Sequence, residues 1–281
     1  MKIVKTVQNM RQLSKKAKIH SKSIGFVPTM GCLHDGHLSL IQRARNNCDV
    51  VVVSIFINPM QFAPGEDFEK YPRDFDMDRK LAESAGADVV FYPDTKHIYS
   101  KDSSTFISVE NLDKIWEGET RPEHFRGVCT IVGKLFNIVN PNIAYFGQKD
   151  AQQVVIIKRM VRDLDFNVEI VTVPIVREKD GLAMSSRNKY LSSEERKAAL
   201  ALYRSLQEAK EMIKNGEKMS YNVLACMRDV INKEKLAHLD YVGIVNPEDF
   251  SAVSKISETG LIIIACRIGK TRLIDNLVVV C

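Results

Sequence analysis

The first 173 residues alternate short apolar runs with amphipathic segments. Residues 23–27 are predicted to form a strand that ends at Pro28, apolar positions between 38 and 45 recur at helical spacing, and residues 50–57 are rich in Val and Ile. An apolar run, a helical segment and a second apolar run in this order are typical of two parallel strands joined by a helix.

The same alternation recurs three more times. Helical patterns at 74–85, 127–139 and 151–164 precede predicted strands at 88–92, 143–146 and 168–173. Because a helix between consecutive strands returns the chain to the same edge of a sheet, the strands are expected to run parallel. The four repetitions predict an α/β domain with a doubly wound, Rossmann-like parallel sheet.

The pattern changes after Pro174. Two predicted helices at 193–215 and 220–235 are followed by apolar strands at 239–245, 260–268 and 273–280. The short turn between the last two strands predicts antiparallel pairing. We therefore expect two domains, residues 1–177 and a smaller α+β domain of residues 178–281, with the boundary inside the 173–188 stretch.

The composition excludes several classes of protein. Of the 281 residues, 45% are apolar and 27% are charged, which is typical of a globular chain and not of a disordered or fibrous one. The longest nearly pure apolar run, residues 50–57, is far shorter than the ~18 residues of a membrane span. The N-terminal segment lacks the continuous apolar stretch of a secretory signal, so we expect a cytoplasmic protein that binds no membrane.

The net charge and the cysteine spacing exclude several kinds of ligand and site. The formal net charge of +5 is interpreted as a mild excess spread along the chain, which suits anionic small molecules and does not argue for nucleic acid. No C-x-x-C pair occurs, which argues against a disulfide scaffold or a tetrahedral zinc site. We expect reduced, mostly buried thiols at all six cysteines: Cys32, Cys48, Cys129, Cys226, Cys266 and Cys281.

The most informative segment is PTMGCLHDGH, from Pro28 to His37. It lies where the first predicted strand ends and a helix begins, and unpaired N–H groups at a helix start attract phosphate. His34 and His37 lie three residues apart there, and Gly36 keeps the backbone open to a ligand. One histidine alone would be interpreted as a cap or a surface residue. The pair at a strand-to-helix turn predicts a phosphate site.

Two further turns are candidates for phosphate binding. Ser185, Ser186 and Arg187 offer two hydroxyls and a guanidinium in succession, although Ser-rich turns before helices are usually caps. Lys149 and Asp150 follow the strand predicted at 143–146. Lys149 would supply a point charge, and Asp150 would either bind a ribose hydroxyl or cap the next helix.

Amides near other strand ends are candidates for substrate contact. Asn58 and Gln61 follow the strand predicted at 50–57, and Gln153 lies one turn into the helix after Asp150. The two glutamine amides could bind hydroxyl and carboxylate oxygens of a small polar substrate. Three further candidates fall in predicted loops, where they would form a lid or lie solvated on the surface: Tyr71, Arg121 and His124.

One apparent motif is rejected. Gly269, Lys270 and Thr271 resemble the end of a P-loop, but Ile264 stands where the first glycine is required. The tripeptide also lies between two apolar strands, so we predict a hairpin turn. Since no G-x-G-x-x-G occurs either, the sequence lacks the fingerprint of a dinucleotide-dependent redox enzyme.

Taken together, the motifs resemble the pantoate–β-alanine ligase (pantothenate synthetase) family of the H-x-G-H nucleotidyltransferase superfamily, which also includes class I aminoacyl-tRNA synthetases. The resemblance covers essentially the whole chain. It rests on FVPTMGCLHDGH at 26–37, INPMQF at 57–62, YPRD at 71–74, RPEHFRGV at 121–128, FGQKD at 146–150 and MSSRN at 184–188. Cys32, Asp35 and Gln148 differ from the commoner choices in the family.

The resemblance implies a two-step ligation. The pantoate carboxylate would attack the α-phosphorus of ATP to give pantoyl adenylate and pyrophosphate, and the amine of β-alanine would then displace AMP. The residues fit this chemistry, because they include donors and cations but no Ser–His–Asp or Cys–His signature of a covalent nucleophile. Catalysis would rest on positioning and on stabilisation of charge.

The resemblance also implies roles for individual residues. Catalysis would involve His34, His37, Lys149 and Arg187, with His37 as the proton donor. The ATP site would be completed by Met30, Gly147, Asp150, Val176, Met184, Ser185 and Ser186. Gln61 and Gln153 would bind pantoate, with Asn58, Tyr71, Arg121 and His124 as further substrate-binding candidates.

Magnesium is expected to arrive with ATP and to be held mainly by phosphate oxygens, with Asp78 as a further candidate ligand. The family resemblance implies a homodimer. Two other functions are weighed against the ligase. An RNA-binding module is opposed by the lack of a basic stripe with interleaved aromatic residues, and a nucleotide sensor would not need both substrate amides and a phosphate clamp.

Overall fold

The computed structural model describes residues 1–63 and 65–280 and divides the chain into two compact units. The first unit comprises Met1–Gly147 and Gln152–Pro174, and the second comprises Gln148–Ala151 and the chain from Ile175 onward. Pro174 lies three residues before the division predicted after residue 177. Within the described residues, no helix is long and apolar enough to cross a membrane.

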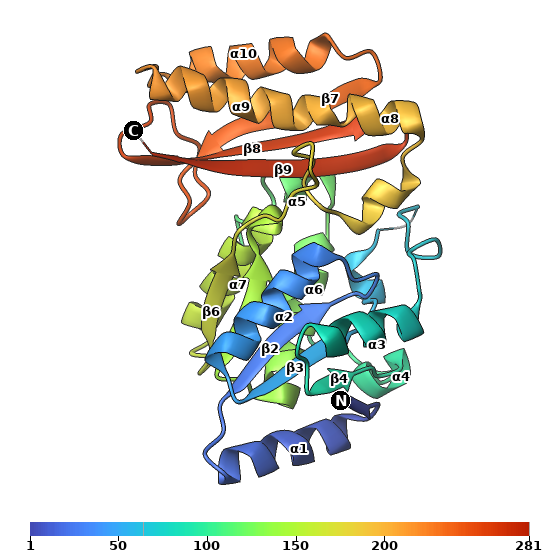
Figure 1. Cartoon of the computed structure of the whole chain (residues 1–281). Coiled ribbons are helices and arrows are strands. Elements are labelled where there is room, and N and C mark those ends of the chain that lie inside the picture. Colours follow the sequence, from blue (N-terminus) through green and yellow to red (C-terminus); the bar gives the residue numbers. More distant parts are fainter. Residues whose placement is uncertain (64, 281) are drawn as a thin grey trace. The chain divides into compact units, whose positions relative to one another are not determined.

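The first unit is built on a six-stranded parallel sheet (Figure 1). Its strand order is β1-β4-β3-β2-β5-β6. The strands are β1 (Lys2–Val4), β2 (Ile24–Thr29), β3 (Val50–Ile55), β4 (Val89–Phe91), β5 (Ile143–Gly147) and β6 (Glu169–Val173). The order reverses between β2 and β5, and ligands of such sheets bind beyond the carboxyl ends of the strands at that point. The predicted doubly wound sheet is confirmed.

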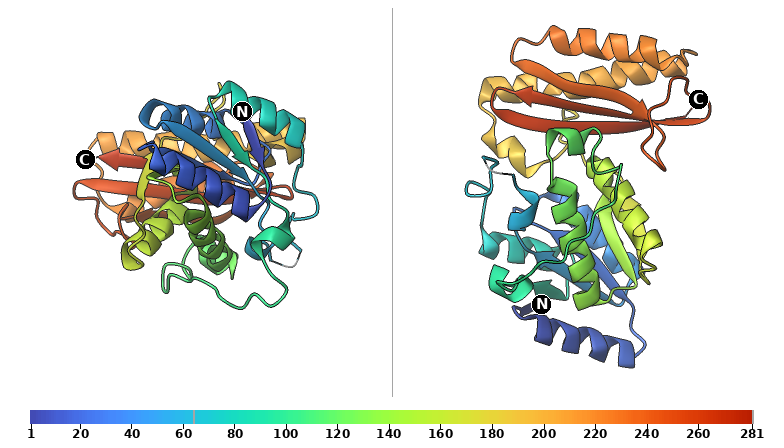
Figure 2. Two further views of the ribbon diagram at one scale, coloured as in Figure 1. Left: turned by 90° about the horizontal axis from the view of Figure 1, so that it is seen from below. Right: turned by 180° about the vertical axis from the view of Figure 1, so that it is seen from behind.

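Helices cover both faces of this sheet. They are α1 (Val7–Ile19), α2 (Asp35–Asn47), α3 (Phe75–Ser84), α4 (Thr95–Ile98), α5 (Glu117–Thr120), α6 (His124–Val139) and α7 (Ala151–Asp163), with a 3-10 turn η1 (Pro59–Gln61). Right-handed crossovers place α2 and α3 on one face and α6 and α7 on the other (Figure 2). Helix α1 packs beside α6.

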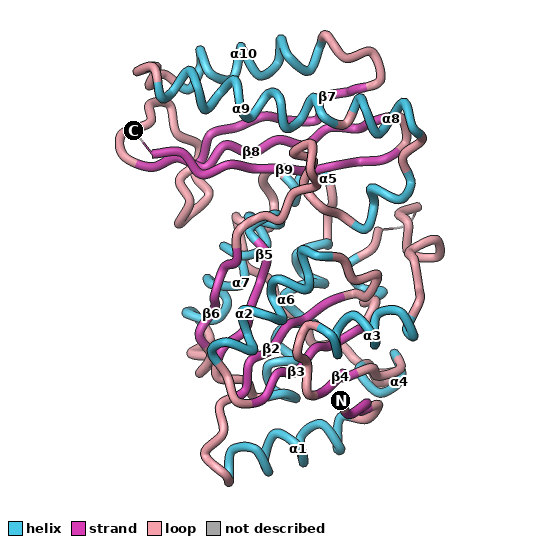
Figure 3. The backbone as a smooth tube through the Cα atoms, viewed as in Figure 1, coloured by secondary structure: helices cyan, strands magenta, loops and turns pink. Residues whose placement is uncertain are grey.

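The second unit contains the predicted antiparallel sheet, in the order β7-β8-β9. Its elements are the 3-10 turns η2 (Gln148–Asp150) and η3 (Ser186–Tyr190), helices α8 (Ser193–Ala198), α9 (Leu200–Lys214) and α10 (Ser220–Asn232), and strands β7 (Ala237–Val245), β8 (Thr259–Ile268) and β9 (Thr271–Val280). Helices α9 and α10 lie along one face of the sheet (Figure 3). The rejected P-loop is the two-residue hairpin between β8 and β9, since Ile268 pairs with Thr271.

Three local predictions were wrong. The predicted strands began only at residue 23, yet residues 2–4 form a strand that pairs with β4. Strand β2 continues through Pro28 to Thr29, because β5 pairs only with Gly25 and Phe26, so the missing N–H of Pro28 breaks no bond on that side. The single helix predicted at 193–215 is interrupted at Ala199. There the hydrogen bond from Leu202 N to Ala199 O spans three residues instead of the four of an α-helix, which changes the helical pitch.

The cysteine prediction is confirmed for the described residues. Five cysteines are free thiols, and four of them are buried. Burial raises the pKa of the Cys129 and Cys266 thiols to about 12, so neither is a reactive thiolate at neutral pH. Cys281 lies outside the described residues.

Gly127 provides a test of the packing between α6 and η1. A Cβ at this position would lie 2.3 Å from the backbone oxygen of Met60, whereas a Cβ at Gly133 would meet only the end of the Ile107 side chain, at 2.6 Å. Alanine normally stabilises a helix by about 1 kcal/mol relative to glycine. We expect Gly127→Ala to lower the free energy of unfolding instead, by more than Gly133→Ala, in chemical denaturation. Equal effects of the two substitutions would contradict this packing.

Candidate active site

The turn after β2 is held by a buried carboxylate. Asp78, on α3, accepts hydrogen bonds from the backbone N–H of Cys32 at 2.9 Å and of Leu33 at 2.7 Å. Gly31 and Cys32 have φ angles of 84° and 51°, in the left-handed region. A Cβ on Gly31 would lie 2.8 Å from the Asp78 carboxylate, so glycine is required there. This contact gives Asp78 an anchoring role, and its candidacy as a magnesium ligand stays a prediction.

The anchored turn sets the two imidazoles at the start of α2. His34 is the N-cap residue and His37 follows in the first turn. Their ring centroids are 4.2 Å apart, and the Nδ1 atom of His37 accepts a hydrogen bond from His34 N–H at 3.3 Å. Neutral His37 therefore carries its ring hydrogen on Nε2. Two imidazoles beside the positive end of a helix are able to donate to an anion.

Asn58 fixes the side chain of Gln61 in η1. The Nδ2 atom of Asn58 donates to Gln61 Oε1 at 3.3 Å and to Gly127 O at 3.0 Å, while its Oδ1 accepts from the Tyr99 hydroxyl at 2.9 Å. Asn58 is only 1% exposed, so its expected direct contact with a substrate gives way to a positioning role. Burial raises the pKa of Tyr99, which keeps its hydroxyl protonated as the donor.

A second network fixes the backbone of Gln61. His124 Nδ1 lies 2.9 Å from Gln61 O, and its Nε2 lies 3.1 Å from Arg121 Nη1. Arg121 also donates from Nε and Nη2 to the two carboxylate oxygens of Glu66, at 2.9 and 2.7 Å. His124 thus donates from Nδ1 and accepts at Nε2, which requires a neutral ring. Burial, reinforced by Arg121, lowers its pKa to about 4.

The solvated-surface alternative for Tyr71, Arg121 and His124 is wrong. Tyr71 is buried with its ring edge-on to Phe62, His124 begins α6, and the guanidinium of Arg121 is bonded to Glu66 and His124. Direct substrate contact by a ring nitrogen of His124 would require one of these bonds to break, because both nitrogens are engaged. The structure therefore favours a positioning role for both residues.

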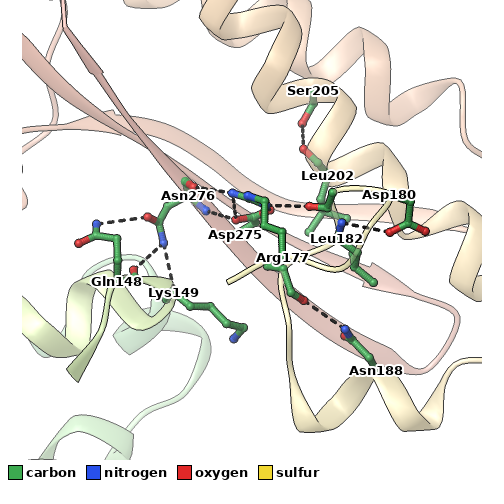
Figure 4. A network of polar contacts seen from close by, with 12 residues as sticks. Gln148, Lys149, Arg177, Asp180, Leu182, Asn188, Leu202, Ser205, Asp275 and Asn276 are labelled. Atoms are coloured by element: carbon green, nitrogen blue, oxygen red, sulfur yellow. Dashed lines mark hydrogen bonds and ion pairs between the residues drawn. The ribbon is translucent and has the colours of Figure 1, made fainter. Parts of the chain in front are cut away.

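In the second unit, Asn276 holds the turn that carries Lys149 (Figure 4). The Nδ2 atom of Asn276 donates to the backbone oxygens of Gln148 at 2.9 Å and of Lys149 at 3.0 Å. The Lys149 Nζ lies 3.6 Å from an Asp150 oxygen, a weak ion pair that leaves the ammonium group able to bind an anion. Gly147 ends β5 with open space where a Cβ would lie.

Arg177 and Asp275 form a buried ion pair beside Asn276. Two guanidinium nitrogens of Arg177 lie 2.6 and 3.0 Å from the carboxylate oxygens of Asp275, whose side chain is 2% exposed. Burial raises the pKa of Asp275, and Arg177 opposes this rise. A buried carboxylate costs several kcal/mol if it loses its partner, so the pair fixes β9 against the start of the 177–183 loop.

The same loop presents the predicted serines and arginine. Met184 N donates to Val176 O at 3.0 Å, so these two candidates are neighbours. Ser185 caps η3 by accepting from Arg187 N at 3.3 Å, as the cap alternative predicted. The cap uses the Ser185 hydroxyl as an acceptor, which leaves its hydrogen to donate. Ser186 is buried, whereas Ser185 and Arg187 are partly exposed.

The two glutamines that remain as candidates, Gln61 and Gln153, lie in different surroundings. The Gln61 Nε2 lies 2.8 Å from the sulfur of Met30. Gln153 is partly exposed on the first turn of α7, next to Gln152, whose buried amide bonds Glu117 N, Leu112 O and Ile115 O. Gln152 therefore fixes the helix start from which Gln153 projects.

The comparisons with known proteins decide the family. Residues 2–278 match the family model described as pantoate-beta-alanine ligase. The chain belongs to the pantoate–β-alanine ligase family. It is 53% identical over 279 residues to a pantothenate synthetase of Caldicellulosiruptor bescii, covering 99% of both chains, and 53% identical over 276 residues to one from Thermotoga neapolitana, covering 98% of this chain and 99% of the other.

Solved structures of ligases agree with the fold. The crystal structure of pantothenate synthetase from Thermus thermophilus matches with a TM-score of 0.94 at 45% identity, covering 99% of each chain. The pantoate-beta-alanine ligase of Francisella tularensis, complexed with beta-gamma ATP and beta-alanine, matches with a TM-score of 0.82 at 36% identity, covering 99% of this chain and 97% of the other.

Several supporting residues of this ligase were missed in the sequence. Tyr99 and Glu66 fall in irregular segments whose partners lie 41 and 55 residues away, so no local pattern indicates them. Asp275 and Asn276 did leave a signal, because two consecutive polar residues interrupt the apolar strand TRLIDNLVVV. Adjacent polar residues in an otherwise apolar strand require buried partners.

The depressed pKa of His124 predicts a pH effect on stability. The unfolded chain protonates this histidine below pH ~6.5, whereas the folded state resists protonation until about pH 4. Stability is therefore lost as the pH falls through this window, by at most about 3 kcal/mol from this residue. His124→Asn keeps an amide N–H near the Nδ1 position but does not titrate.

Denaturation of the wild type and of His124→Asn between pH 7.5 and 4 checks this expectation. Carboxylates contribute to both proteins alike, so the difference between the two curves reports His124. We expect the wild type to lose stability more steeply between pH 6.5 and 4. Parallel curves would show that His124 titrates normally.

Proposed function

We propose that the turn from His34 to His37 binds the ATP phosphates in a ligation of (R)-pantoate to β-alanine. As a pantoate–β-alanine ligase, the chain forms pantothenate through a pantoyl adenylate and releases pyrophosphate and AMP. The observation that carries the assignment of the turn is the pair of imidazoles, 4.2 Å apart, at the first turn of α2 and beside the switch point of the sheet.

During adenylation, negative charge develops on the oxygens around the α-phosphorus and on the departing pyrophosphate. A pantoate carboxylate oxygen bonds to the α-phosphorus as the bond to the pyrophosphate oxygen breaks. The amine of β-alanine then attacks the acyl carbon, AMP leaves with the bonding electron pair, and the amine loses a proton. No enzyme atom is covalently joined, so rate enhancement rests on orientation and on stabilisation of the developing charge.

The residues assigned to the nucleotide are those that the family resemblance implies. His37 Nε2–H and His34 would donate to phosphate oxygens, and Lys149, Ser185, Ser186 and Arg187 would hold the triphosphate. The adenosine part would be lined by Met30, Gly147, Asp150, Val176 and Met184. Support comes from the open space at Gly147 and from the anchoring of Lys149 by Asn276.

Pantoate is assigned to Gln61 and Gln153. Because Gln61 Oε1 is engaged by Asn58, its Nε2 is the group that would donate to a carboxylate or hydroxyl oxygen of pantoate. Asn58, Arg121 and His124 would act by holding Gln61, and Tyr71 by packing beside Phe62.

Magnesium would be bound chiefly through ATP. Within the described residues, no group of three His, Cys, Asp or Glu side chains is arranged to hold a metal ion. Both carboxylate oxygens of Asp78 accept bonds from the turn that precedes α2. The residues present therefore fit a magnesium ion that is held by the ATP phosphate oxygens and that would neutralise their charge. A homodimer and a cytoplasmic location are further proposals that rest on the family resemblance.

The function is tested by product formation. We expect AMP and pantothenate to appear in equal amounts when the protein is mixed with ATP, magnesium, pantoate and β-alanine. Omission of pantoate or of β-alanine should abolish pantothenate formation. Mass spectrometry of the mixture is the measurement, and AMP formed without pantothenate would contradict ligation.

His37→Ala should lower the rate of adenylation by roughly two to four orders of magnitude, the range for loss of a transition-state donor or acid. The fold should survive, because the change lies in the first turn of α2 and leaves the Asp78 anchor intact. His97→Ala, a change at an exposed histidine in the same unit, is the matched control. Near-normal turnover of His37→Ala would remove this residue from the mechanism.

Tyr99→Phe should weaken pantoate binding about three- to tenfold, because loss of one hydrogen bond frees the Asn58 amide that orients Gln61. ATP binding should be unchanged. Calorimetric titration with each ligand separates the two effects, and Tyr221→Phe, at a 76% exposed site, is the control. An equal loss of both affinities would indicate general structural damage.

A further inference from the structure

The N-terminal segment is far more basic than the rest of the chain. Residues 1–22 contain seven Lys and Arg residues and no Asp or Glu, whereas the whole chain carries a net charge of only +5. The interpretation that the positive excess is spread along the chain was therefore wrong. Most of this charge lies on α1, which has no acidic residue in its first turn.

A cavity of about 450 Å³, which is a groove open to the surface, lies between α1 and the end of α6. Arg11, Lys15 and Lys18 line it from α1, at positions i, i+4 and i+7 on one face of the helix. Its volume falls within the range of small-molecule sites. Ile19 and Ile138 add apolar surface to the lining.

None of these three cations has an ion-pair partner within residues 1–63 and 65–280. Lysines on a helix face are often merely solvated, so the charges alone do not define a site. A second observation distinguishes this face. Ser14, which also lines the cavity, is 3% exposed, and its hydroxyl has no hydrogen-bond partner among the described residues.

The polar lining from α6 completes the donor set. Asn137 and Asn140 contribute exposed amides. No basic residue lies in the last turn of α6, so the cations of the lining come from α1. The carbonyl end of α6 carries about half a negative charge, which the three cations of α1 outweigh about sixfold. The local field therefore favours an anion.

We propose that the cavity between α1 and α6 binds a compact organic anion with a phosphate or diphosphate group. The row Arg11, Lys15 and Lys18 extends about 10 Å along the helix, which suits a ligand with more than one negative charge. The anionic group would lie against this row, and a small outward rotation of the Ser14 side chain would let its unpartnered hydroxyl donate to an anion oxygen. A small apolar part would contact Ile19 and Ile138. None of these residues belongs to the proposed ligase site.

Inorganic pyrophosphate is the probe for this cavity. Calorimetric titration compares the wild type with the double variant Arg11→Ala/Lys15→Ala, in buffer without magnesium. The control double variant Lys197→Ala/Lys210→Ala removes two exposed lysines of α8 and α9. Lys149→Ala removes a cation of the proposed ligase site, so that binding there is distinguished from binding at α1.

We expect pyrophosphate binding that survives Lys149→Ala, is unchanged in the control, weakens with rising salt and becomes at least about tenfold weaker in Arg11→Ala/Lys15→Ala. Unchanged melting temperature and turnover would show that this double variant is folded. The proposal is overturned if Lys149→Ala abolishes all pyrophosphate binding, or if Arg11→Ala/Lys15→Ala binds as the wild type does. It is also overturned if that variant only lowers the melting temperature, since the cations would then merely stabilise the end of α6.

Discussion

The contact between the Asp78 carboxylate and the turn after β2 is the constraint on which the site depends. Two backbone N–H groups that point at one buried carboxylate force the turn into a left-handed conformation at Gly31 and Cys32. That conformation ends the strand and makes His34 the cap of α2, so His37 falls on the same side of the helix start. Without the carboxylate, two buried donors would lose their partner, at a cost of about 1–3 kcal/mol each.

The same principle recurs at each functional turn. Several of the side chains proposed to touch substrate are oriented by buried polar groups of their own unit. Asn58 and Tyr99 orient Gln61, and Asn276 holds the turn of Lys149. Such supports cost free energy when they lose a partner. Preorganisation of this kind suits a reaction that relies on positioning and charge stabilisation.

The sequence was informative wherever the signal was local. Hydrophobic periodicity predicted the parallel sheet and the antiparallel strands, and H-x-G-H located the start of α2, because strand, helix and cap preferences depend on neighbouring residues. It failed where a distant partner decides. The three-residue strand β1 exists only through its pairing with β4. Likewise, Arg121 and His124 were expected in loops because nothing near them in the sequence shows Glu66 or the backbone oxygen of Gln61.

The central claim is that this scaffold activates pantoate as an adenylate before the amine reacts. Isotope exchange between labelled pyrophosphate and ATP tests it most directly, because exchange requires reversible formation of the adenylate. With ATP, magnesium and pantoate, but no β-alanine, label should enter ATP, and omission of pantoate should stop it. Exchange that strictly requires β-alanine, or that proceeds without pantoate, would contradict the account.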